Sequence, residues 1–109
     1  MASYYKILGQ ALPVANTFTD IYTVPNTANA VVSTVNICNV TNGNVTFRLL
    51  ARPRGNTIAT QQYIAYDVPI LPQDATSVSL GMSLGASDVL TVFSFQGNTA
   101  FTVFGTEIQ

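Results

Sequence analysis

The chain has 109 residues, of which 48% are hydrophobic and only 8% are charged, whereas about 25% of residues are charged in a typical soluble domain. The formal net charge of −1 excludes a general electrostatic attraction to nucleic acid or to anionic lipid. Histidine is absent, which excludes His-based acid–base catalysis, Ser–His and Cys–His nucleophiles and imidazole metal sites.

Neutral polar residues must therefore supply most of the polar surface, and the chain contains 14 Thr, 9 Asn, 7 Ser and 6 Gln. Such a surface has little self-repulsion, which favours a protein that works at high local concentration among its neighbours. A stable extracellular domain with a neutral surface is the alternative. The length predicts a single domain over residues 1–109 whose core needs no disulfide, and Cys38 is the only cysteine.

The chain carries no sign of a membrane span or a secretion signal. No apolar run approaches the roughly 18 residues of a transmembrane helix. Residues 1–10 contain one Lys and lack an apolar stretch before a small-residue cleavage site. We therefore expect no membrane association and synthesis in a cytoplasm without processing.

Short runs of β-branched and aromatic residues alternate with polar residues along the chain, and Gly, Pro and Asn separate them. This pattern is typical of strands, and no window carries a helical stripe beyond one possible turn at 84–87. The expected strands are 3–9, 18–24, 29–40, 45–52, 61–68, 75–82, 88–95 and 99–107. This spacing predicts an all-β fold, an antiparallel β-sandwich with jelly-roll or Ig-like topology, with a small barrel as the alternative.

Two connections contain dipeptides that favour tight reversals. Asn42-Gly43 separates the strands 29–40 and 45–52, and Gly97-Asn98 separates the strands 88–95 and 99–107. Asn-Gly tolerates the positive φ angles of a type I′ turn, whose twist matches that of paired strands. We expect a β-hairpin at each of these two places.

Alternation along each strand assigns side chains to faces. In the strand 45–52 the odd-numbered residues face the core, and Arg48 and Arg52 share the opposite face. The last two strands are apolar on both faces, with Phe104 opposite Phe101. Either a partner subunit or the chain's own loops would cover the second apolar face. The predicted core comprises Val35, Ile37, Phe47, Leu49, Phe93 and Phe95.

No catalytic, metal-binding or cofactor-binding residues are predicted. The acids are scattered, and Asp20, Asp74 and Asp88 stand where turns and strand entries favour Asp. No spacing supports a Ca²⁺ loop or a carboxylate pair for glycoside hydrolysis. The glycines match neither a phosphate-binding loop nor a dinucleotide-binding motif.

Three of the four basic residues, Arg48, Arg52 and Arg54, fall within seven positions. One hypothesis is that carboxylates of the chain itself, such as Asp67 or Glu107, pair with them. The other is that they bind an acidic patch on a partner, because guanidinium groups pair carboxylates in a directional, bidentate geometry. Nucleic acid is the least favoured partner because the whole chain is slightly acidic.

Aromatic residues add a second group of candidate contacts. Tyr63 and Tyr66 form one pair in the sequence. Aromatic residues near strands could stack on sugars, but tyrosine also packs in cores and interfaces with its hydroxyl in water, which is the favoured interpretation. Tyr4 and Tyr5 stand together near the start of the chain, and Phe104 lies on the second apolar face of the last strand. The predicted partner interface comprises Arg48, Arg52, Arg54, Tyr4, Tyr5 and Phe104.

Four segments carry a resemblance to known proteins: YKILGQALPVANTFTDIYTVPNTANAVVSTVNICN, FRLLARPRG, YIAYDVPILPQDATSVSLGMSLGASDVLTVFS and FTVFGTEI. Together they resemble small all-β virion structural proteins of tailed bacteriophages, including marine and cyanobacterial phages. The resemblance runs from about Tyr5 to Ile108. Its most specific parts are LGQ, TDIYTVP, YDVPI with the following LPQD turn, and SLGASDVLTV.

The resemblance implies a non-enzymatic component of the virion, assembled in the host cytoplasm. A capsid decoration (cement) protein is the first expectation, bound to the major capsid protein or to other virion subunits. It also implies a homo-oligomer, with a trimer favoured. A tail- or fibre-associated structural or adhesion protein is one alternative. A carbohydrate-binding module is another, although such modules usually contain Trp and this chain has none.

Overall fold

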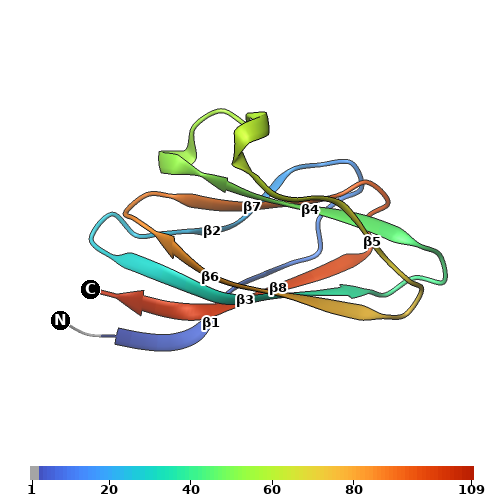
Figure 1. The fold of residues 1–109 in the computed structure, drawn as a ribbon, viewed down its shortest axis with the longest axis horizontal. Helices are drawn as coiled ribbons and strands as arrows, with labels where there is room; N and C mark the ends of the chain where they lie inside the picture. Colours follow the sequence, from blue (N-terminus) through green and yellow to red (C-terminus); the bar gives the residue numbers. More distant parts are fainter. Residues whose placement is uncertain (1–2) are drawn as a thin grey trace.

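The computed structural model describes residues 3–109, which form eight strands in two facing sheets (Figure 1). The strands are β1 (Ser3–Ala11), β2 (Thr19–Thr23), β3 (Asn29–Asn39), β4 (Val45–Arg52), β5 (Tyr63–Ile70), β6 (Ala75–Leu84), β7 (Val89–Ser94) and β8 (Thr99–Ile108). The eight predicted strands are confirmed, with ends that differ by at most two residues. The predicted single domain of residues 1–109 includes residues 1–2, which lie outside the described residues.

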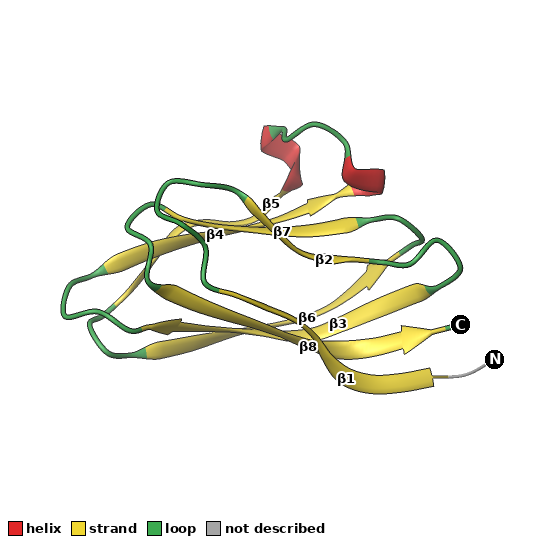
Figure 2. Ribbon diagram, turned by 180° about the vertical axis from the view of Figure 1, so that it is seen from behind, coloured by secondary structure: helices red, strands yellow, loops and turns green. Residues whose placement is uncertain are grey.

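Two short segments of 3₁₀ helix, η1 (Pro53–Gly55) and η2 (Thr60–Gln62), lie in the connection between β4 and β5 (Figure 2). The helical turn considered at 84–87 is instead a tight turn, in which the Asp88 N–H donates to the Gly85 carbonyl at 3.1 Å. No helix within residues 3–109 has the length and apolar character needed to span a bilayer.

The strands pair in a nested order. Sheet A has the order β1-β8-β3-β6 and sheet B the order β2-β7-β4-β5, and neighbouring strands are antiparallel. The first strand therefore pairs with the last, the second with the seventh, the third with the sixth and the fourth with the fifth. An antiparallel ribbon that is doubled back and rolled in this way is a jelly roll. The structure confirms the antiparallel sandwich, and its topology is the jelly roll rather than the Ig-like arrangement.

Neither of the two predicted hairpins forms. β3 and β8 belong to sheet A, whereas β4 and β7 belong to sheet B, so the chain crosses between sheets at Asn42-Gly43 and at Gly97-Asn98. Gly97 and Asn98 do have positive φ angles of 73° and 51°, but Asn42 and Gly43 do not adopt the left-handed region that a type I′ turn requires. A tight turn reverses the chain, but it does not determine whether the next strand pairs with the previous one or joins the facing sheet.

The core lies between the sheets, where the inward side chains of the central strands meet. Val35 and Ile37 of β3 and Phe47 and Leu49 of β4 are buried there, as predicted. Phe47 contacts Phe101 of β8 edge to face, with ring centroids 6.2 Å apart. Each such apolar side chain contributes about 1.5–3 kcal/mol by leaving water.

The other two predicted core residues lie elsewhere. Phe95 is 60% exposed, because β7 ends at Ser94 and Phe95 begins the crossing to sheet A. Phe93 is buried on the outer face of sheet B, where the Phe18 ring packs at 4.6 Å and the Arg48 guanidinium lies 4.7 Å from its ring centroid. The chain itself thus covers the second apolar face of β7, whereas Phe104 on the outer face of β8 remains 40% exposed.

The connections divide between the two ends of the sandwich. The start of β1 and the end of β8 lie at the left end in Figure 1, together with the crossings 24–28 and 85–88. The opposite end contains the four other crossings, at residues 12–18, 40–44, 71–74 and 95–98 (Figure 1). We call these four crossings the loop end.

Candidate partner-binding surfaces

The predicted interface residues lie on opposite faces of the sandwich. Arg48 and Arg52 are on the outer face of sheet B, and Arg54 follows in η1. Tyr5 and Phe104 are on the outer face of sheet A, and Tyr4 alternates to the other side of β1 with its side chain half exposed. The six residues therefore do not form one site.

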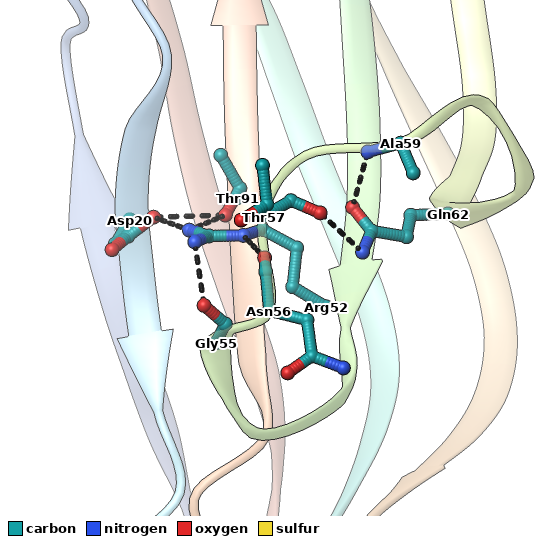
Figure 3. Close-up of polar contacts among 8 residues, drawn as sticks. All are labelled: Asp20, Arg52, Gly55, Asn56, Thr57, Ala59, Gln62 and Thr91. Atoms are coloured by element: carbon teal, nitrogen blue, oxygen red, sulfur yellow. Dashed lines mark hydrogen bonds and ion pairs between the residues drawn. The ribbon is translucent and has the colours of Figure 1, made fainter.

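Arg52 joins β4 to its neighbours and holds the turn that follows it (Figure 3). Its Nε donates to the Asn56 carbonyl at 2.8 Å and its Nη2 to the Gly55 carbonyl at 2.9 Å. Its Nη1 lies 2.8 Å from Oδ1 of Asp20 on β2, and the same oxygen accepts a hydrogen bond from the Thr91 hydroxyl of β7. Arg52 thus has a structural role that links three strands and η1.

Gln62 closes the second half of the same connection. Its Nε2 donates to the Thr57 carbonyl and its Oε1 accepts from the Ala59 N–H, both at 3.0 Å (Figure 3). Between these two anchors Arg54 has a positive φ of 53°, and its N–H donates to Oδ1 of Asp88. The Arg54 side chain is exposed.

Arg48 is paired within the chain as well. Its Nε and Nη2 donate to the two carboxylate oxygens of Asp67 at 2.6 and 3.2 Å, a bidentate geometry. Its guanidinium carbon lies 4.2 Å from the ring centroid of Tyr66. The hydrogen bonds with Asp67 raise the pKa of Arg48 and lower the pKa of Asp67.

Two of the three arginines, Arg48 and Arg52, therefore pair with carboxylates of the chain itself, as the first hypothesis predicted. Asp67 was one of the two carboxylates expected to pair with an arginine, whereas Glu107 pairs with Lys6 instead. Asp20, the partner of Arg52, was not predicted. Binding of a partner by these arginines stays a prediction, and Arg54 is the member of the cluster whose side chain is exposed.

The outer face of sheet A contains a shallow hollow of about 550 Å³. Tyr5 and Ile7 of β1 and Phe104 of β8 line it, and Tyr5 is 85% exposed. The backbone of Gly105 forms part of its lining. A Cβ at Gly105 would lie 2.2 Å from the carbonyl oxygen of Val31, so this close pairing of β8 with β3 requires glycine.

Sheet A carries few charged residues, and one of them, Lys6, lies at this hollow. Its four strands contain two charged residues, Lys6 and Glu107, and their charged atoms lie 3.3 Å apart. Glu107 is buried on the inner side, where it accepts a hydrogen bond from the Tyr22 hydroxyl at 2.6 Å. This hydrogen bond and Lys6 lower the pKa of Glu107, while burial and Glu107 raise the pKa of Tyr22. The charged residues of the sheet B strands are Asp20, Arg48, Arg52 and Asp67.

The loop end is a third surface, which the sequence reading missed. Its exposed apolar side chains come from all four crossings and are between 57% and 73% exposed: Leu12, Val14, Val40, Leu71 and Phe95. Val40 and Phe95 fall at the ends of predicted strands, and the other three residues fall outside the predicted strands. The available signal was their position beside turn residues, as in Leu12-Pro13-Val14 and Leu71-Pro72.

A buried amide connects two of these crossings. Asn39, at the end of β3, is fully buried, and its Nδ2 donates to the carbonyls of Gly43, Ile70 and Leu71 at 2.8, 3.1 and 3.0 Å. Its Oδ1 accepts from the N–H and the hydroxyl of Thr41 at 2.9 and 2.7 Å. All its hydrogen-bonding groups are used, so the crossings 40–44 and 71–74 are held in one arrangement.

Within residues 3–109, no three Cys, Asp or Glu side chains lie close enough together to bind an ion. The remaining candidate sites are therefore the surfaces described above.

Comparison with known proteins bears on the fold. No protein-family model matches this chain, and no characterised protein matches it in sequence. Its structure is similar to part of a chain from infectious bursal disease virus, Gx strain, with a TM-score of 0.52 and 8% sequence identity. The similarity covers 97% of this chain and 30% of the viral chain. At this identity the two chains share a fold and nothing more specific.

Proposed function

We propose that this protein is a non-enzymatic structural component of a tailed-bacteriophage virion, and that it is a decoration (cement) protein that binds the head shell. The observation that carries the proposal is the outer face of sheet A. Tyr5, Ile7 and Phe104 surround a shallow hollow on it, and the one charged residue at this hollow is Lys6, which is paired with Glu107. Depletion of charge and enrichment in aromatic residues mark the central part of protein–protein interfaces.

The fold and the composition support the same role. Jelly rolls occur in viral shells but also in lectins and cupins, so the fold alone does not assign a function. Its similarity to part of a viral chain agrees with a place in a virion. A neutral Thr- and Asn-rich surface allows many copies to stand close together without electrostatic repulsion. The major capsid protein is the proposed partner, and a homo-oligomer, with a trimer favoured, is the proposed state on the particle.

The proposal is tested on particles of the source phage, separated into heads and tails. Quantitative mass spectrometry should find this chain in many copies on heads. Heads that lack the chain should release their DNA at a lower temperature than complete heads. Finding the chain on tails would favour the alternative role, and its absence from both fractions would refute a virion role.

Point variants test which surface docks. Tyr5→Ser and Phe104→Ser alter the outer face of sheet A, and Tyr66→Ser is a matched loss of an exposed ring on sheet B. We expect the first two to reduce incorporation into heads at an unchanged melting temperature, and the third to incorporate normally. Equal incorporation of all three variants would show that sheet A is not the docking face. Arg54→Gln tests the exposed arginine in the same assay.

A tail- or fibre-associated adhesion protein is the second candidate, and one observation favours it. Tyr63, Tyr66 and Thr60 line a hollow of about 380 Å³ on the sheet B side, with the two rings perpendicular and 4.8 Å apart. Aromatic faces beside hydroxyl and carboxylate groups are suited to binding saccharides. Binding of host surface polysaccharide that Tyr66→Ala abolishes and Tyr5→Ala leaves unchanged would support this role.

A further inference from the structure

We propose that the loop end binds the loop end of a second copy of this chain. The inference goes beyond the proposed function, because it concerns a different surface from the outer face of sheet A. It rests on the continuity, the rigidity, the charge and the size of this end of the sandwich.

Hydrogen bonds between neighbouring crossings make the loop end one continuous surface. The Asn16 N–H donates to the Ser94 carbonyl at 2.9 Å, which joins the first crossing to the end of β7. The Val40 N–H donates to the Asn98 carbonyl at 3.3 Å. The Gln73 N–H donates to the Thr41 carbonyl at 3.1 Å. The four crossings that carry the exposed apolar side chains are therefore joined to one another at this end of the sandwich.

This surface is organised before any partner arrives. Asn39 fixes two of the crossings through its buried amide. Gln96 fixes a third to β4, because its Oε1 accepts from the Thr46 N–H at 2.9 Å. A rigid apolar surface loses little conformational entropy on binding, so more of the free energy of burial goes into affinity.

The electrostatics of the loop end favour a copy of the same chain. Its four crossings contain one charged residue, Asp74, and no basic residue. The surface therefore does not attract nucleic acid or anionic lipid. Charged groups also provide orientation and selectivity between different proteins, and this surface has almost none. It suits an equally uncharged partner that is already at high local concentration, and two loop ends can meet without burying opposed charges.

The size of the loop end predicts a weak contact. The molecule measures 45 × 28 × 19 Å along its principal axes, so the cross-section perpendicular to the long axis is at most about 530 Å². Two copies that meet end to end would bury at most about 1,060 Å² in total, close to the lower limit of about 1,000 Å² for a specific interface. We expect a dissociation constant of about 10 μM to 1 mM for free chains. Attachment of several copies to one particle would raise the effective affinity.

Sedimentation velocity over about 5 μM to 1 mM tests the proposal. The test variant combines Leu71→Asn with Phe95→Asn, and Tyr5→Asn is the matched control on sheet A. We expect the wild type and the control to associate with rising concentration. The test variant should have a dissociation constant at least about tenfold higher. A dimer or a trimer that depends on these two residues supports the proposal.

Several results would overturn it. One is a wild-type monomer throughout this concentration range. Another is association that Tyr5→Asn abolishes and the test variant retains, which would assign self-association to sheet A. A third is flotation of the wild type, but not of the test variant, with phosphatidylcholine vesicles, which would identify lipid as the occupant.

NMR of the wild type tests the loop-end contact without any substitution. Amide signals that shift on dilution should belong to the loop end, and shifts confined to other residues would contradict the proposal. Incorporation into heads is measured separately with the sheet A variants. A failure of the loop-end contact is therefore distinguishable from a failure of the virion role.

Discussion

Replacement of the buried Asn39 amide should cost the protein a large part of its stability. Asn39→Ala removes five hydrogen bonds and leaves the Ile70 carbonyl without its buried donor. An unsatisfied buried acceptor costs about 1–3 kcal/mol, and each of the other, partly buried hydrogen bonds contributes about 0.5 kcal/mol. We therefore expect the free energy of unfolding to fall by about 3–5 kcal/mol. Urea unfolding followed by far-UV circular dichroism measures it, and a loss below about 1 kcal/mol would refute this reasoning.

Asn39→Asp separates the hydrogen bonds from side-chain volume. The new carboxyl keeps an acceptor for Thr41 but places an oxygen against the three carbonyls that now accept from Nδ2. Burial and the missing donors should raise the folded-state pKa of this carboxyl above its unfolded value of about 3.9. Its favourable contribution is then complete below the unfolded pKa and disappears as the pH rises through the folded pKa.

Acidification should therefore raise the stability of the variant relative to that of the wild type. The wild type loses stability in acid, because the folded-state pKa values of Asp67 and Glu107 are lowered. Between about pH 6 and pH 4, Asn39→Asp should gain stability relative to the wild type. Parallel pH profiles for the two proteins would show that the three donated hydrogen bonds do not matter.

Three further predictions concern the core, the arginines and acid stability. Phe47→Ala should lower the free energy of unfolding by urea by about 3–5 kcal/mol, because it is a large-to-small change at a buried position. Phe95→Ala, at an exposed position, should lower it by less than about 0.5 kcal/mol. Similar losses for the two variants would contradict the burial described. Arg52→Gln should lower stability by about 1–3 kcal/mol because three strands lose a common anchor, and Arg54→Gln should leave the melting temperature unchanged. Glu107→Gln should cost about 1–3 kcal/mol at pH 7. It should also flatten the loss of stability in acid, because the contribution of a lowered folded-state pKa is complete above the unfolded Glu pKa of about 4.3 and is lost as the pH falls through the folded pKa; an unchanged acid profile would exclude Glu107 as a source of the loss.

The positions of the strands could be predicted because their signal is local. Alternation of apolar and polar residues determines which side chains can be buried together, and it placed Phe47 and Leu49 correctly. The assignment of strands to sheets was not local. Asn42-Gly43 indicates that the chain reverses its direction. Whether the next strand forms a hairpin with β3 or crosses to the facing sheet depends on which strand covers the apolar face of β4.

The candidate sites were harder to predict from the sequence, because they also depend on which strands lie side by side. Asp20 is 32 residues from Arg52 along the chain, and only the pairing of β2 and β4 with β7 brings them together. Phe95 continues the apolar pattern of β7, yet the strand ends one residue earlier. The loop end is assembled from four crossings that are contiguous only in the jelly roll, so no single segment of sequence describes it.

The nested pairing also has a consequence for how the chain reaches this structure. β8 lies between β1 and β3 in sheet A, so β1 has no partner strand until β8 has been synthesised. β4 and β5 are the only consecutive strands in the described chain that pair directly, and their loop costs the least entropy to close. Once they pair, β3 and β6 are brought near each other, then β2 and β7, and finally β1 and β8. We therefore expect folding to begin with β4 and β5 and to end with the pairing of β1 and β8.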